Sequence, residues 1–326
     1  MEYDEYIEKS KKILNRFLFL SNKFCEEVCN LDGLPEILLN LGDNEDSKIN
    51  PKVSYDYDYF AFAKGTKTLY AIRELLNADK AYSEDVFVLV RSILENHIFS
   101  RYVREHIDNK QEIKKVIYDT IVAPVGTVFS YYVYDRNFKT SVDKDGNIIG
   151  KNPSPYSIVS PNDRTYYSCL YGFLSRFAHC NFSVILNYID DDYAMFNIDK
   201  KNDILLAYVV SIFAFTKLYE GVVTVNGEDL GDRVEERKYY DVCYDSLEYQ
   251  NNVLDFLIDY YTNKLLTKNE IVIQAYASDI EKGKNMNDII VIMLSRMKES
   301  LNDDDLSSLN KSVFSDGKYE RFYPEE

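Results

Sequence analysis

Residues 86–103 read VFVLVRSILENHIFSRYV, and this stretch decides the fold class. Apolar side chains lie on almost every side of the helix that these letters predict, which is typical of a helix inside a core. Ser83 is a good N-cap for such a helix, and the acids Glu84 and Asp85 suit its first turn. We therefore expect a core helix over residues 83–106.

The rest of the chain has the same helical texture. Glycine and proline number only 12 and 7 among 326 residues, which argues against an all-β protein with its many turns. Apolar periodicity predicts further helices over residues 4–29, 59–77, 110–134, 164–189, 202–223 and 232–264, with two shorter ones between residues 268 and 300. The helix over 110–134 should bend near Pro124. The fold class that follows is all-α, a multi-helix bundle.

Two stretches interrupt the helices. Residues 30–58 are rich in glycine, proline and acids and are predicted to form a loop. Residues 137–162 form an insert in which Asp145-Gly146 is a hairpin-type turn between two short apolar runs. We expect a helical bundle domain over residues 1–225 that carries this insert, and a helical C-terminal extension over residues 226–326 that ends in a loose, charged tail.

Composition narrows the class of protein. The net charge of −16 shows no basic nucleic-acid footprint for the whole chain, although a local basic patch is compatible with it. Five cysteines without zinc-like spacing predict reduced thiols and a cytoplasmic protein. The apolar run Ile204–Phe215 is too short to span a bilayer of about 30 Å. No Walker loop or dinucleotide glycine pattern occurs, so we expect a soluble protein with no cofactor, no metal and no membrane partner.

Two charged side chains stand inside the apolar helix over residues 83–106. Arg91 and Glu95 are four residues apart, so they share one helical face and can form an ion pair. Removing one partner of a buried pair typically costs ~3–5 kcal/mol, yet apolar side chains of similar size are often as stable as the pair. Arg91 and Glu95 therefore indicate either a structural salt bridge or a functional site, and both interpretations stay open.

A second predicted helix carries a stripe of polar and small side chains. Residues 166–186 read YYSCLYGFLSRFAHCNFSVIL, in which Ser175 and His179 are one helical turn apart. Arg176 precedes His179 by three positions. A histidine on such a face is more often a core residue than a catalyst, and its polar neighbours weaken that expectation without reversing it. We expect Arg91 and the rest of its polar face to meet this stripe.

The two polar segments together resemble a family of uncharacterised bacterial helical domains, catalogued as a domain of unknown function. The residues that carry the resemblance are Arg91 and Glu95, followed by Tyr167, Tyr171, Leu174, Ser175 and His179. The resemblance covers roughly residues 60–220. It implies a helical bundle in which the two polar stripes meet, and it implies no established reaction.

The core helix also has a weaker similarity to HEPN-type ribonucleases. These enzymes use an arginine that is followed, after four to six residues, by a histidine, usually across a helical dimer interface. Arg91 and His97 have five residues between them, and Arg101 and His106 have four. Two matches within one helix show that the pattern arises easily by chance.

Metal-free RNA cleavage needs a base near the 2′-hydroxyl group and a cation near the phosphate, and histidine and arginine suit these roles. His179 with Arg91 or Arg176 would supply the same chemistry from two helices. A serine hydrolase is disfavoured because no G-x-S-x-G elbow surrounds Ser175.

The leading expectation is a HEPN-like helical effector, a metal-independent ribonuclease of bacterial stress response or phage defence. Its candidate catalytic residues are Arg91, Glu95, His97, Ser175, Arg176 and His179. Its expected partners are RNA, a protein of a defence or toxin–antitoxin system, and a second copy of the chain in a homodimer. The alternative is a non-catalytic helical protein, whose polar set is structural or senses a small anion or nucleotide.

Overall fold

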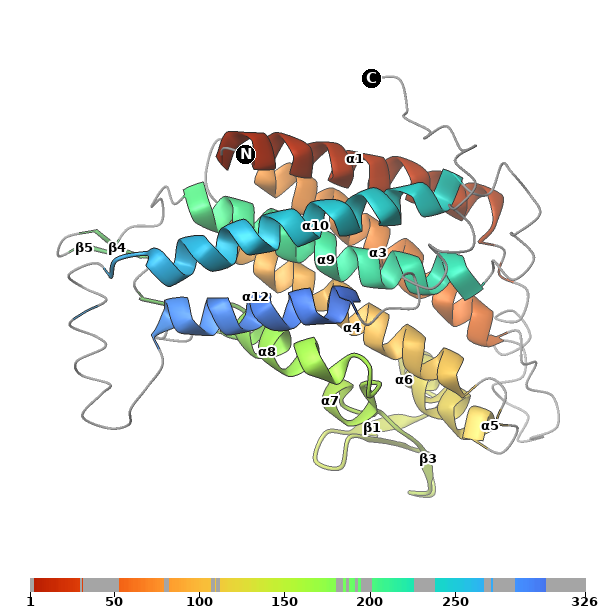
Figure 1. Cartoon of the computed structure of the whole chain (residues 1–326). Helices are drawn as coiled ribbons and strands as arrows, with labels where there is room; N and C mark the ends of the chain where they lie inside the picture. The colour runs from red at the N-terminus through yellow and green to blue at the C-terminus, as the bar shows by residue number, and fades with distance from the viewer. Residues whose placement is uncertain are drawn as a thin grey trace. The chain divides into compact units, whose positions relative to one another are not determined.

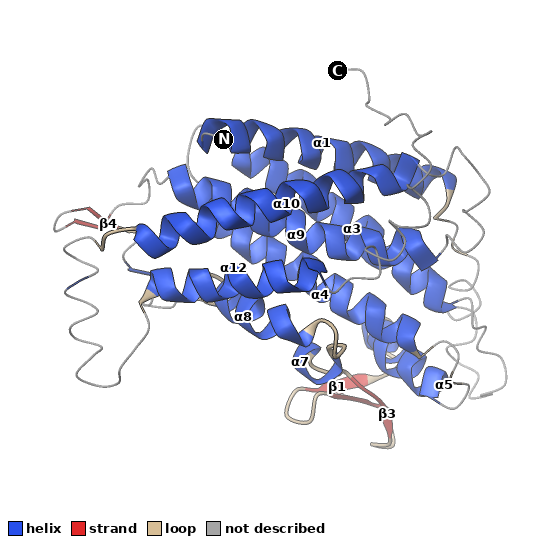
Figure 2. Cartoon of the chain, in the orientation of Figure 1, coloured by secondary structure: helices blue, strands red, loops and turns tan. Residues whose placement is uncertain are grey.

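The computed structural model describes residues 3–29, 31, 53–78, 82–106, 109, 112–179, 184–185, 188–190, 193–194, 201–225, 238–266, 271 and 285–302. Of the interpretable residues, 78% are helical, and strands contribute one small three-stranded sheet and one two-stranded pair (Figure 2). The predicted class, a mostly helical bundle, is confirmed.

The elements follow one another in the order α1 (Tyr3–Glu27), α3 (Val53–Leu76), α4 (Ser83–Glu105), α5 (Glu112–Ile117), the π-helical turn η2 (Tyr118–Val122), α6 (Ala123–Val128), β1 (Val133–Asp135), β2 (Thr140–Val142), β3 (Ile148–Lys151), α7 (Pro155–Ile158), α8 (Arg164–Ser175), β4 (Ile189–Asp190), β5 (Tyr193–Ala194), α9 (Lys201–Val225), α10 (Lys238–Asn263) and α12 (Met286–Asn302). Helix α3 begins at Val53 rather than at residue 59, so the end of the predicted loop over 30–58 is helical. Tyrosine and aspartate are weak helix formers, but Asp56 lies in the first turn, where a negative charge stabilises a helix.

The chain folds into two compact units, and the first comprises Met1–Leu20, Lys67–Leu94 and Pro161–Glu326. Within it, α10 packs against both α9 and α12, and α12 packs against α8 (Figure 1). Polar contacts fix α1 to α10: the guanidinium group of Arg16 pairs with Asp245, and the hydroxyl groups of Ser10 and Tyr249 are hydrogen-bonded. The predicted domain boundary at 225/226 lies beside residues 226–237, which are outside the described residues, and it stays a prediction.

Helix α9 is the apolar centre of this first unit. Its segment Asp203–Val223 has a mean hydropathy of 1.5 and is long and apolar enough to cross a membrane, longer than the run over 204–215 that the sequence suggested. However, 89% of the segment is buried inside the protein. Such burial is expected of the central helix of a soluble bundle, in agreement with the predicted soluble class.

The second unit comprises Ser21–Thr66 and Glu95–Ser160. It contains the sheet β1-β2-β3, in which neighbouring strands are antiparallel, and the predicted hairpin is confirmed by the pairing of β2 with β3. Asp143 accepts hydrogen bonds from the amides of Asp145 and Asn147 in the turn, and Gly146 has the positive φ of 83° that favours glycine there. The irregularity expected at Pro124 takes the form of the π-helical turn η2 just before it.

Candidate functional site

Aromatic side chains hold α4 against α8 in the first unit. The ring of Phe87 lies 5.2 Å from that of Phe173 and 4.8 Å from that of Phe177, between ring centres. Aromatic pairs at such distances add to the stability that burial provides. This contact brings the two helices that carry the predicted polar residues side by side.

Arg91 is half-buried on α4 and reaches α8 through Tyr171. Its Nη2 atom donates a hydrogen bond to the Tyr171 hydroxyl oxygen at 2.6 Å, and the guanidinium carbon lies 4.7 Å from the centre of the ring. The ring of Tyr171 in turn stacks on that of Tyr167, at 5.0 Å between centres and 23° between planes. A hydrogen bond and a cation–π contact thus fix the position of the Arg91 cation.

The helix that follows is shorter than its sequence suggests. It was predicted over 164–189, but α8 ends at Ser175, and residues 176–179 form turns. The reason is local, because the amides of Arg176 and Phe177 donate to carbonyl oxygens three residues earlier, as in a 3₁₀ turn. The prediction that Ser175 and His179 occupy successive turns of one helix is therefore wrong. The side chain of His179 lies beyond the helix and is exposed.

Ser175 and Arg176, which were predicted to act in catalysis, both contact other parts of the protein. The Ser175 hydroxyl donates to the carbonyl oxygen of Tyr171 at 2.7 Å, a bond within its own helix. The Nη1 atom of Arg176 lies 3.6 Å from the sulfur of Met286 on α12. Because the hydroxyl proton of Ser175 is donated to its own helix, the contact gives no support to a serine nucleophile.

Glu95 and His97 belong to the part of α4 that falls in the second unit. Glu95 is half-buried, whereas only 3% of His97 is exposed. Burial of this depth keeps the His97 imidazole away from an RNA strand in solution. The predicted approach of Glu95 to Ser175 stays a prediction.

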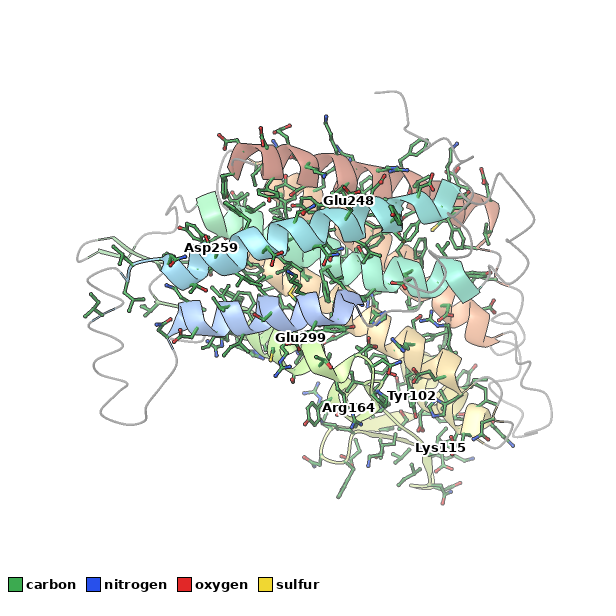
Figure 3. All side chains as sticks on the ribbon, viewed as in Figure 1. Tyr102, Lys115, Arg164, Glu248, Asp259 and Glu299 are labelled. Carbon is green, nitrogen blue, oxygen red and sulfur yellow. The ribbon has the colours of Figure 1, made fainter. Side chains whose placement is uncertain are left out.

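The second arginine–histidine match lies at the C-terminal end of α4, close to Tyr102 (Figure 3). The Nε atom of Arg101 donates to the Glu105 carboxylate at 2.9 Å. His106 Nδ1 lies 2.7 Å from the carbonyl oxygen of Tyr102, which can only accept, so Nδ1 carries a proton. His106 Nε2 lies 3.5 Å from the carboxylate of Glu112. Both ring nitrogens of His106 thus face oxygen atoms.

A buried acid that the sequence did not single out lies in the second unit. Asp58 accepts hydrogen bonds from the Ser100 hydroxyl at 2.6 Å and from Arg104 Nη1 at 3.4 Å. Burial raises the pKa of Asp58 to about 6, although Arg104 and Ser100 oppose the rise. The signal was missed because residues 30–58 were predicted to form a loop, where an aspartate needs no partner.

Comparison with known proteins finds no matching family model, no matching curated protein and no matching solved structure. Among the residues that the structure describes, no group of three or more histidine, cysteine, aspartate and glutamate side chains is arranged to hold a metal ion. The function therefore has to be inferred from the side chains of the chain itself.

Proposed function

We propose that the protein is a HEPN-like helical effector that cleaves RNA without a metal ion, within a stress-response or defence system. One observation carries the proposal. Arg91 on α4 is fixed against Tyr171 of α8, the helix that leads to Arg176 and to the exposed His179. Arg91 is thus carried by one helix, and Arg176 and the accessible imidazole of His179 follow the end of a second helix that contacts it.

These side chains suit transesterification of RNA. The His179 imidazole takes the proton of a 2′-hydroxyl group, the 2′-oxygen bonds to the adjacent phosphorus, and the bond from phosphorus to the 5′-oxygen breaks. The imidazolium returns its proton to the departing 5′-oxygen, so that the products are a 2′,3′-cyclic phosphate and a free 5′-hydroxyl group. Arg91 or Arg176 stabilises the additional negative charge on the phosphate in the transition state. HEPN-like sites usually form between subunits, so a homodimer is part of the proposal.

The chain contains only three histidines, which allows the base to be assigned by exhaustion. Purified protein is incubated with end-labelled single-stranded RNA and a chelator, and each variant His179→Ala, His106→Ala and His97→Ala is compared with the wild type. We expect loss of at least about 100-fold in cleavage rate for His179→Ala, since general base catalysis contributes that much. His106→Ala should cleave like the wild type.

Three outcomes count against the proposal. RNA that stays intact with the wild type removes the enzymatic function. Loss of cleavage in His106→Ala alone moves the site to the end of α4, beside Arg101. Loss in His97→Ala alone moves it to Arg91 and His97, provided that the circular dichroism spectrum and melting temperature of that variant show that it is folded.

A non-catalytic role is the second candidate, and a specific observation favours it. The Arg91 guanidinium group and the Ser175 hydroxyl group both bind Tyr171, so part of the polar set forms its own hydrogen-bonded network. In that role Arg176 and His179 bind a small anion or a partner protein. Light scattering measures the mass of the purified chain, alone and with proteins that co-purify with it. A complex of larger mass together with a negative RNA assay would support this role rather than catalysis.

A further inference from the structure

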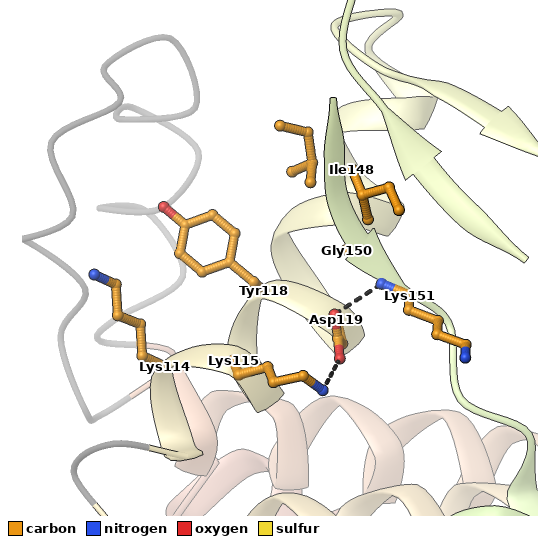
Figure 4. A pocket seen from close by; sticks show the side chains of 8 residues that line it. Lys114, Lys115, Tyr118, Asp119, Ile148, Gly150 and Lys151 are labelled. Atoms are coloured by element: carbon orange, nitrogen blue, oxygen red, sulfur yellow. Dashed lines mark hydrogen bonds and ion pairs between the residues drawn. The ribbon is translucent and has the colours of Figure 1, made fainter. Parts of the chain in front are cut away.

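A pocket of about 430 Å³ lies in the second unit between the π-helical turn η2 and strand β3 (Figure 4). Its volume falls within the range of roughly 300–1,000 Å³ that is usual for small-molecule sites. Three lysines, Lys114, Lys115 and Lys151, line it together with Tyr118 and one acid. None of the candidate residues of the first unit contributes to it.

The irregular backbone of η2 shapes this pocket. Pro124 has no amide proton, and its ring clashes with the carbonyl group four residues earlier in a regular α-helix. The chain widens instead, and the amide of Ala123 donates to the carbonyl oxygen of Tyr118, five residues back. Such π-helical turns occur frequently at functional sites. Here the turn presents Asp119 to strand β3.

Asp119 organises one end of the pocket. One carboxylate oxygen accepts a hydrogen bond from the amide of Lys151 at 2.8 Å, and the other accepts one from the ammonium group of Lys115 at 2.9 Å. The side chain of Asp119 is only 8% exposed, whereas that of Lys115 is 73% exposed. Figure 4 shows Lys115 and Lys151 on either side of Asp119. The acid therefore fixes the ammonium group of Lys115 and the backbone of Lys151, and is itself largely hidden from a ligand.

The charge of the pocket is opposite to that of the chain. Three ammonium groups and one carboxylate give a net charge of about +2 at neutral pH, in a chain whose net charge is −16. The hydrogen bond with Asp119 raises the pKa of Lys115, so this lysine stays protonated. A local positive field in an acidic protein attracts a small anion to this place.

The other end of the pocket is apolar and aromatic. Tyr118 and Ile148 project there from η2 and from β3 (Figure 4). Ile148 is 68% exposed, so its side chain is accessible to a ligand in the pocket. A flat aromatic ligand group placed between Tyr118 and Ile148 would cover both.

We infer that this pocket binds a nucleoside monophosphate or diphosphate, with the phosphate against the ammonium groups of the lining lysines and the base against Tyr118 and Ile148. The inference does not depend on the proposed ribonuclease activity, because the two sites share no residue. A single-stranded RNA is a poorer fit. RNA-binding surfaces extend a positive stripe along several phosphates, and in this pocket the positive charge is gathered around one acid.

Isothermal titration of the full chain with ADP and AMP tests the inference, with adenosine and inorganic phosphate as partial ligands. We expect ADP and AMP to bind at least about tenfold more tightly than either partial ligand, because each partial ligand contacts only one end of the pocket. The double variant Lys115→Gln/Lys151→Gln should weaken binding of ADP at least about tenfold. The matched control is Lys144→Gln, an exposed lysine on the turn between β2 and β3 that does not line the pocket.

The outcomes are distinct. Tight binding of ADP that Lys144→Gln preserves and the double variant loses supports the inference. Absence of binding of both nucleotides at millimolar concentration overturns it, and so does binding that the double variant leaves unchanged. A labelled single-stranded RNA that binds through the two lysines, while ADP does not, also overturns it and assigns the pocket to RNA. Equal melting temperatures of the variants show that none of these results comes from unfolding.

Discussion

Gly150 and Gly172 form a matched pair that tests how closely β3 packs on η2. A Cβ atom at Gly150 would lie 2.7 Å from the Cβ of Ala123 and 3.1 Å from the carbonyl oxygen of Tyr118. Neither atom can rotate away, so Gly150→Ala requires a shift of the backbone, and overpacking of this kind costs about 1–3 kcal/mol. The lower entropy of the unfolded chain offsets about 0.4–1 kcal/mol of this, which leaves a net destabilisation of up to about 2.6 kcal/mol, and about 1.3 kcal/mol at the middle of both ranges.

Gly172 is the control because it lies exposed within α8, and a methyl group added there would meet no heavy atom within 4 Å beyond its own helix. Alanine there should stabilise the protein by about 0.5–1 kcal/mol, since glycine is a poor helix former. Urea denaturation followed by circular dichroism measures both variants, and we expect free energies of unfolding that change in opposite directions. If Gly150→Ala is as stable as the wild type, β3 does not approach η2 this closely, and the shape of the lysine pocket loses its basis.

Three further predictions concern the other polar residues. The pKa of about 6 for Asp58 exceeds its value in the unfolded chain, so the folded state binds more protons between roughly pH 4 and 6. Wild-type stability should therefore gain up to roughly 3 kcal/mol from this group as the pH falls from about 7 to about 4. Urea titrations at both pH values should show that Asp58→Asn lacks this gain, and equal pH dependence of the two proteins would contradict the assignment. Tyr171→Phe should lower the free energy of unfolding by roughly 1–2 kcal/mol through loss of the hydrogen bond from Arg91, while Ser175→Ala changes it by less than about 0.5 kcal/mol. If RNA contacts only Arg91 and Arg176, its affinity should fall about sevenfold for a fourfold increase in salt, from a slope near −0.7 per contact. A much steeper slope in a filter-binding assay would require cations outside this pair.

Periodicity predicted the helices well, because an apolar pattern is a local property. It found α4 almost to the residue, since Ser83 and the acids after it mark the start of the helix. Periodicity placed the start of α3 too late, because tyrosines and aspartates weaken the helical signal there. The buried Asp58 lies in this missed part of the helix, so it was not recognised as a buried acid. Periodicity also extended α8 beyond Ser175, because a tighter hydrogen-bonding pattern ends the helix without a glycine or a proline.

The candidate sites depend on contacts between distant segments, and these leave little trace in the sequence. Arg91 contacts Tyr171, 80 positions along the chain. The resemblance placed Tyr171 in the segment expected to meet Arg91, but nothing in the sequence indicated this tyrosine rather than Ser175 as the side chain that Arg91 contacts. The lysine pocket joins Lys115 to Lys151 only because Asp119 lies on a π-helical turn, which a helical wheel of regular period does not contain. Pro124 was the single local signal. It indicated that the helix bends, but not that the bend would bring Asp119 next to strand β3.

Burial and hydrogen bonding separate the three histidines, although their spacing from an arginine does not. His97 is buried, so RNA would reach it only after α4 moves. His106 has both ring nitrogens facing oxygen atoms, and the carboxylate of Glu112 beside Nε2 would repel a phosphate. His179 is exposed and follows the helix against which Arg91 is fixed. An imidazole that exchanges protons with a polyanionic substrate needs access and a nearby cation. Of the three histidines, His179 is the exposed one, and Arg176 precedes it by three positions in the sequence. For this reason the proposed chemistry rests on His179 rather than on the spacing motif.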